Sequence, residues 1–185
     1  MTETFFSESN LIPGEANTYN GYTFTKIADT NGSFDSLLAS SINDSGTVAF
    51  SGRLDDGSEG VFTSSGRELT TIIDTSSSSF DTFGDPVINN NGTVVIEAAQ
   101  LADDNSVSND AILTGSGGEL TTIASSGDRF FGFQSQPDLN DRGTVAFFAN
   151  PPGEFESLFT ASADGEISTL VTAIDNMVSL LVQTP

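Results

Sequence analysis

The chain has 185 residues, enough for one domain with a sizeable hydrophobic core. Its 26 acidic residues and only 5 Lys and Arg residues give a formal net charge of -21, which repels phosphate backbones and anionic membranes, so no nucleic-acid partner is expected. Cysteine and histidine are both absent, which removes disulfides, zinc sites of the Cys/His type and any Ser-His-Asp triad.

The N-terminal segment, residues 1–29, contains no basic region followed by an apolar run, the pattern typical of a signal peptide. Neither this segment nor any later stretch approaches the roughly 20 apolar residues of a membrane span, so we expect no membrane insertion. The segment ends in Thr23–Asp29 (TFTKIAD), a motif that returns three times further along the chain. We expect this copy to be an extra fourth strand ahead of the first complete repeat.

Three sequence repeats make up most of the chain. They span about 30–74, 75–125 and 126–175, and a C-terminal segment covers 176–185. Each contains one nine-residue phrase, INDSGTVAF, INNNGTVVI or LNDRGTVAF, whose glycines (Gly46, Gly92 and Gly143) lie 46 and 51 residues apart. FDSL, FDTF and FFGF precede these phrases, and ELTTIID, ELTTIAS and EISTLVT follow them. Because several landmarks keep the same spacing, we interpret the chain as a tandem repeat.

The second repeat shows four short strands most clearly. They are expected at Asp85–Asn89, Thr93–Ala98, Ala111–Thr114 and Leu120–Ala124, where Val, Ile and Thr dominate and turn-forming residues fill the gaps. In the third repeat, TVAFFA is mostly apolar on both faces, which indicates that both faces are covered. We therefore predict an all-β fold: a β-propeller-like array of three four-stranded antiparallel blades, with a partial fourth unit from the two termini.

A tight reversal between the first two strands of each repeat explains the Asn-x-x-Gly phrase. Asn43, Asn89 and Asn140 can bond to their own backbone at the entrance of the turn, and the glycine can take the positive φ that closes it. A role for the asparagines as ligands is the alternative interpretation.

The repeated phrase also resembles a known family. It reads N-x-x-G-x-x-A-F in the first repeat (Asn43 to Phe50) and the third (Asn140 to Phe147), whereas Val95 and Ile96 replace Ala and Phe in the second. This pattern resembles the choice-of-anchor tandem-repeat proteins named for NxxGxxAF, common in cyanobacteria, over Tyr22 to Asp175. The resemblance implies propeller-like repeats, a bacterial origin and an extracellular or cell-surface location, and it implies no catalytic residue.

The loop between the second and third strands of every repeat is acidic. These loops contain Asp55, Asp56 and Glu59, then Asp103, Asp104 and Asp110, and then Glu154 and Glu156. In a propeller they would share one rim, and calcium takes about six to eight oxygen ligands, so these carboxylates are candidate calcium ligands. None of the loops has the spacing of an EF-hand, and a solvated, solubilising rim is the alternative.

The sequence predicts function only by class. We expect a non-enzymatic binding or scaffold module that recognises a glycan or a protein on or near the bacterial surface. The alternative is a carboxylate-dependent glycoside-active enzyme, which needs two placed acids, one with a raised pKa; acids in solvated loops do not favour that. The repeated aromatic residues could stack on a sugar or pack between blades: Phe34, Phe80, Phe83, Phe130 and Phe133.

Self-association is the last expectation from the sequence. Complete propellers have about four to eight blades, so three repeats leave two apolar blade faces available to another chain. Copies joined head-to-tail would form a closed ring or a filament. The alternative is a monomer that closes as a distorted four-bladed ring, its last blade assembled from both termini.

Overall fold

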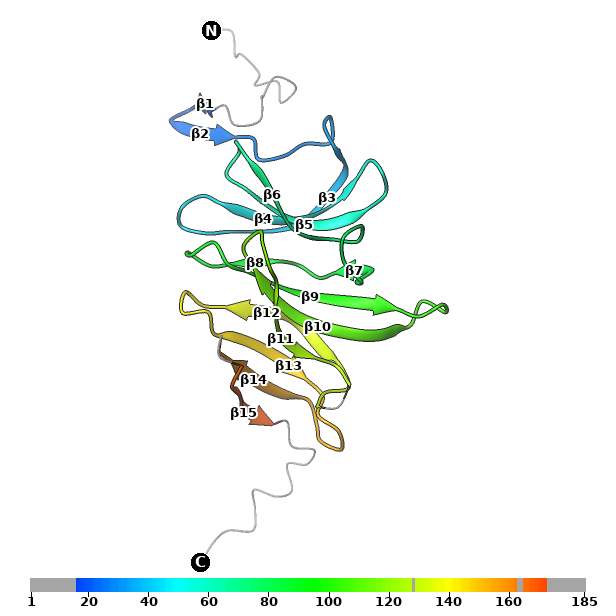
Figure 1. The fold of residues 1–185 in the computed structure, drawn as a ribbon. Helices are drawn as coiled ribbons and strands as arrows, with labels where there is room; N and C mark the ends of the chain where they lie inside the picture. Colours follow the sequence, from blue (N-terminus) through cyan, green and yellow to red (C-terminus); the bar gives the residue numbers. More distant parts are fainter. Residues whose placement is uncertain (1–15, 128, 163–164, 173–185) are drawn as a thin grey trace, which may run out of the picture.

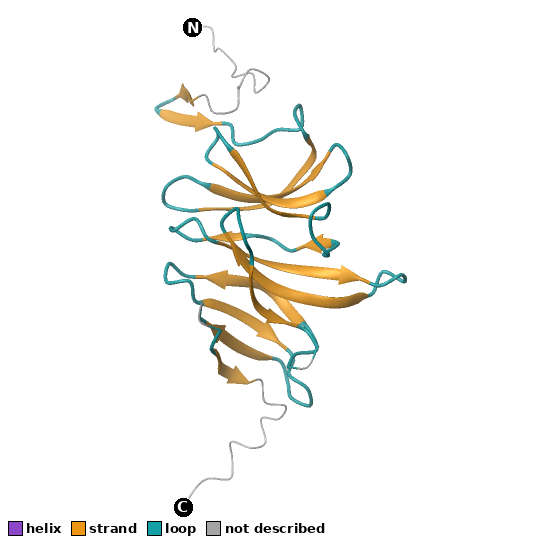
Figure 2. Cartoon of the chain, viewed as in Figure 1, coloured by secondary structure: helices purple, strands orange, loops and turns teal. Residues whose placement is uncertain are grey.

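A computed structural model of the chain describes residues 16–127, 129–162 and 165–172. All regular secondary structure in this part is β-strand (Figure 2), which confirms the predicted all-β class. A helix long and apolar enough to cross a membrane is accordingly not found among these residues. The predicted C-terminal segment, 176–185, and its contribution to a fourth unit lie outside the described residues.

The strands form one hairpin and three larger antiparallel sheets in which neighbours in sequence pair (Figure 1). The hairpin contains β1 (Ala16–Tyr19) and β2 (Tyr22–Thr25). Sheet 1 contains β3 (Phe34–Ile42), β4 (Val48–Leu54), β5 (Glu59–Ser64) and β6 (Leu69–Asp74). Sheet 2 contains β7 (Thr82–Phe83), β8 (Val87–Ile88), β9 (Val94–Leu101), β10 (Val107–Gly115) and β11 (Thr121–Ser125). Sheet 3 contains β12 (Phe133–Leu139), β13 (Val145–Ala149), β14 (Ser157–Ala161) and β15 (Ile167–Thr172). Each sheet thus falls within one predicted repeat.

The first strand of every sheet is irregular. In sheet 2 it consists of two pieces, β7 and β8, which both pair antiparallel with β9, so the predicted strand Asp85–Asn89 matches only the second piece. Pro86 lies between the two pieces and has no N–H to donate to a neighbouring strand. β3 and β12 continue through the corresponding region but change register there, between Leu37 and Ser40 and between Gln134 and Asp138.

The sheets stack face to face along the chain (Figure 1), and two apolar clusters fill the space between them. Alternate residues of β9 serve the two clusters: Val94 and Ile96 pack toward sheet 1, whereas Val95 packs toward sheet 3. Sheet 2 therefore has both faces covered. For TVAFFA in sheet 3, the prediction that both faces are covered is wrong, because no further sheet of described residues follows sheet 3. Phe147 is 1% exposed, but Phe148 on the other face is 39% exposed.

The extra motif Thr23–Asp29 is a strand only in its first part. β2 pairs with β1 alone, and residues 26–29 have no regular structure. This irregular part lies on the outer face of sheet 1, where Ile27 and Ala28 pack against a buried aromatic cluster. The prediction of a complete fourth strand is therefore wrong for residues 26–29, since no strand of the described residues pairs with them.

Candidate functional site

The three Asn-x-x-Gly turns are stacked and joined by their asparagine side chains. Asn43 Nδ2 donates to the backbone oxygen of Asn89 (3.1 Å), and Asn89 Nδ2 donates to that of Asn140 (3.0 Å). In all three turns Oδ1 accepts the backbone N–H four residues further on, which confirms the predicted turn role. We call this set of three side chains the Asn ladder; its bonds between repeats were not foreseen, although an identical turn in every repeat was the available signal.

The Asn ladder ends at the third turn with an unused donor. Asn140 is exposed, whereas Asn43 and Asn89 are 9% and 4% exposed, and Asn140 Nδ2 donates to no group among the described residues. A second row of bonds ends in the same way. Asp44 N donates to Asn90 Oδ1 and Asn90 N donates to Asp141 Oδ1, each at 2.8 Å, but the N–H of Asp141 has no such acceptor in the described part of the chain.

The outer face of sheet 1, which we call the first face, carries an aromatic cluster. The rings of Phe34, Phe50 and Phe62 contact one another with centroid separations of 5.1 to 5.8 Å. Residues 26–29 cross this cluster, and Lys26 Nζ forms an ion pair with Asp29 Oδ2 at 2.7 Å. This bond to Lys26 lowers the pKa of the Asp29 carboxyl.

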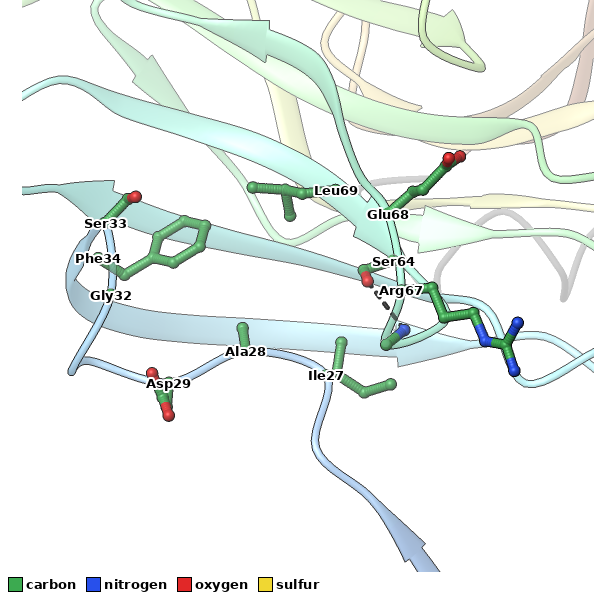
Figure 3. A pocket seen from close by; sticks show the side chains of 11 residues that line it. Ile27, Ala28, Asp29, Gly32, Ser33, Phe34, Ser64, Arg67, Glu68 and Leu69 are labelled. Carbon is green, nitrogen blue, oxygen red and sulfur yellow. Dashed lines mark hydrogen bonds between the residues drawn. The ribbon is translucent and has the colours of Figure 1, made fainter. Parts of the chain in front are cut away.

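Residues 26–29 cover the first face incompletely, and a hollow remains on either side. One, of about 330 Å³, is lined mainly by apolar side chains, including Leu37, Leu38 and Val48. The other, of about 180 Å³, reaches from Phe34 to Leu69 and Arg67 (Figure 3). Leu38 is 64% exposed and Leu69 is 48% exposed, so the first face presents apolar surface to solvent.

The outer face of sheet 3, the last face, exposes a motif that is buried elsewhere. A bulge in the fourth strand of sheets 1 and 2 sets two consecutive apolar residues, Ile72–Ile73 and Ile123–Ala124, against the next sheet. β15 has the same bulge at Leu170, but here Leu170 and Val171 are 57% and 61% exposed.

The predicted calcium ligands lie in three separate hairpins. Asp55, Asp56, Asp103 and Asp104 lie in turns, Glu154 and Glu156 lie in the β13–β14 loop, Glu59 begins β5, and Asp110 lies within β10. In the described ranges, no three acidic side chains come close enough together to hold a metal ion. Asp56 and Asp104 each bond a serine two residues on, which stabilises their own turns and lowers the pKa of both carboxyls.

Calcium binding by these hairpins therefore stays a prediction, which thermal unfolding can test. Specific sites would raise the melting temperature with calcium far more than with magnesium, following the logarithmic dependence on free ligand. Equal small rises with both ions, reproduced by sodium chloride, would show only screening of the net charge of -21.

The acid with the most unusual environment is Glu97 in β9. Burial raises its pKa, and the nearby charge of Asp110 raises it further. Asp110 is 7% exposed; its Oδ2 accepts the N–H of Phe133 at 3.2 Å, and its Oδ1 has no hydrogen-bond partner among the residues that the structure describes. Our prediction placed Asp110 in a solvated loop and missed this pair, although Glu97 stands inside an apolar run.

Replacing Glu97 by glutamine should stabilise the protein at neutral pH. Because burial raises the pKa of Glu97, the folded state favours the protonated carboxyl group. Protonated Glu97 therefore contributes fully to stability below its ordinary pKa, and this contribution is lost as the pH rises through the raised pKa of the folded state. We expect Glu97→Gln to melt higher than the wild type at about pH 7 and to converge with it near pH ~4. The exposed Glu119→Gln is the control. A Glu97→Gln difference that is the same at both pH values would contradict the assignment.

Comparison with known proteins matches the chain to a family model. A family model described as a family of unknown function (DUF7453) matches residues 25–177, which include all three sheets. No curated protein and no solved structure matches the chain. The family description names no ligand or activity, so the resemblance to NxxGxxAF repeats stays a prediction.

Proposed function

Because the chain belongs to the DUF7453 family, whose function is unknown, we propose from its own geometry that it is a non-enzymatic binding and scaffold module. The observation that carries this proposal is the first face, an apolar surface only partly covered by residues 26–29. Exposed apolar surface of this kind is typical of a site that binds another protein. A protein partner is therefore the first candidate.

A glycan is the second candidate ligand. The repeated phenylalanines do not support it, because Phe34, Phe130 and Phe133 are buried and Phe80 and Phe83 pack against the cluster between sheets 1 and 2. A polar hollow of about 340 Å³ does support it. That hollow is lined by residues that include Arg129, Glu154 and Thr169.

The architecture and location complete the proposal. Three stacked four-stranded sheets with one repeated strand order support a propeller-like array. A place on or near the bacterial surface is supported by the NxxGxxAF resemblance alone.

A carboxylate-dependent glycoside-active enzyme remains the alternative proposal. Glu97 and Asp110 supply two acids, and the pKa of Glu97 is raised, as a general acid requires. However, neither Glu97 nor Asp110 lines the two hollows of the first face or the polar hollow beside Arg129. The absence of either acid from these hollows favours the binding module.

The proposed function can be tested with an immobilised full chain. Leu38→Asp places a charge in the larger hollow of the first face, and Val107→Asp places one on an exposed apolar residue of β10. We expect the wild type and Val107→Asp to retain the same protein from a bacterial envelope extract and Leu38→Asp to lose it. Hits on a glycan array that survive Leu38→Asp would instead favour the polar hollow, and hydrolysis of a glycoside would favour the enzyme.

A further inference from the structure

We infer that the last face binds the first face of a second copy of this chain, head-to-tail, and displaces residues 26–29 from it. The inference rests on the proposed function in one respect, that the first face is a binding surface. Three independent features of the described residues support it: a repeated sheet-to-sheet interface, an imperfect internal substitute for it, and the unfinished Asn ladder.

The interface already occurs twice within one chain. Ile72–Ile73 pack on sheet 2 and Ile123–Ala124 pack on sheet 3, in both cases from a bulge in the fourth strand. The equivalent pair on the last face, Leu170–Val171, has no sheet of described residues beneath it. An identical contact with another copy would bury it.

The first face has the matching half of this interface. In sheet 3 the cross-strand pair Phe147–Phe159 lies in the cluster that receives Ile123–Ala124. Phe50 and Phe62 form the same cross-strand pair in sheet 1, with ring centroids 5.8 Å apart. Both faces needed for a head-to-tail contact are therefore present, one at each end of the stack.

Residues 26–29 act as an internal substitute for the missing sheet. In the motif TFTKIAD, Ile27–Ala28 correspond to Ile72–Ile73 of ELTTIID, and they lie on the equivalent face. Unlike β6, they are not part of a strand, and they leave hollows of about 330 and 180 Å³ beside them. A complete sheet carrying Leu170–Val171 would fill this space better.

The Asn ladder gives the contact its direction. Within the described part of the chain, Asn140 Nδ2 is an unused donor at one end, and at the other end the backbone oxygen of Asn43 accepts only the N–H of Gly46. In the second turn the oxygen of Asn89 accepts both the N–H of Gly92 and the side chain of Asn43, so this oxygen position can accept two bonds. Asn140 of one copy can therefore donate to Asn43 of the next.

Asn140→Asp tests the inference without disturbing the turn. The variant keeps the Oδ1 that accepts the N–H groups of Arg142 and Thr144, and it replaces only the unused donor. Asn105→Asp, at an exposed turn residue of sheet 2, adds the same charge elsewhere. By sedimentation equilibrium at high salt, which screens the net charge of -21, we expect the wild type and Asn105→Asp to associate and Asn140→Asp to associate about tenfold more weakly. The melting temperature of the Asn140→Asp monomer should equal that of the wild type.

Cross-linking tests the direction of the contact, since the chain has no cysteine of its own. Ser45→Cys and Arg142→Cys place a thiol in the first and third turns, and a short bismaleimide should join the two variants to each other but neither to itself. Ser45→Cys combined with Asn91→Cys in one chain is the positive control, because those two turns are stacked.

The outcomes separate the inference from the proposed function. A purified chain that stays at 19.3 kDa at all concentrations, or Asn140→Asp that associates like the wild type, overturns the inference. If the wild type still retains a different protein from the extract and Leu38→Asp does not, the proposed function holds although the self-association is absent. If neither copy nor extract protein binds, both fail.

Discussion

Phe147→Ala lowers the free energy of unfolding by about 4 kcal/mol, the largest effect we expect from a single substitution. The Phe147 side chain is 1% exposed and lies between sheets 2 and 3. Its ring centroid is 5.8 Å from Phe130, 5.6 Å from Phe133 and 5.7 Å from Phe159. Truncation removes burial of a large apolar side chain and leaves a cavity that three aromatic neighbours cannot close.

Equilibrium unfolding in urea measures this effect, and Phe131→Ala is the matched control. Phe131 is 72% exposed, so its truncation should change the free energy of unfolding by no more than about 0.5 kcal/mol. Comparable losses for the two variants would mean that the space between sheets 2 and 3 does not form the core of the folded state.

Asn89→Ala should cost about 3 kcal/mol, the second-largest effect. The substitution removes three bonds: Nδ2 donates to the oxygen of Asn140 at 3.0 Å, and Oδ1 accepts from Asn91 at 3.0 Å and Thr93 at 2.9 Å. Asn89 is 4% exposed, so groups left without partners there are poorly placed to bond water instead.

The equivalent substitutions distinguish the turn from the Asn ladder. Asn140→Ala removes only the two turn bonds, at an exposed site, and should cost about 1 kcal/mol. Asn89→Asp keeps the turn bonds but sets a carboxylate oxygen against the backbone oxygen of Asn140, so it should be clearly destabilising, whereas Asn140→Asp should be neutral. If Asn89→Asp were as stable as Asn140→Asp in urea, the bonds between repeats would contribute nothing.

The strands could be predicted because all three repeats contain the same sequence pattern. The predicted strand Ala111–Thr114 falls within β10, and Thr93–Ala98 and Leu120–Ala124 overlap β9 and β11 in all but their first residue. The β-propensity of Val, Ile and Thr, interrupted by turn-forming residues, was sufficient for this. The division of the first strand into β7 and β8 was not predicted. The β-propensity of Val87 and Ile88 does not show that Pro86, which has no N–H, interrupts the hydrogen bonds between strands.

The candidate site was harder to predict because its residues act across repeats. A turn explains Asn89 completely within its own repeat, so nothing in the local pattern indicates a bond to Asn140 51 residues away. The same holds for Ile27 and Ala28, whose motif predicts a strand. No strand of the described residues pairs with them, and they cover the first face as irregular chain.

The irregular strands at the sheet edges determine how molecules can meet in a concentrated solution. Each sheet has its shifted or divided first strand at one edge and the bulged fourth strand at the other. Pro86 and Pro137 belong to these first-strand regions and offer no backbone donor. Flat, regular edges are what cross-β aggregation requires, and bulges and prolines block it. A chain this rich in β-strand should therefore remain free of amyloid when it is concentrated or gently heated.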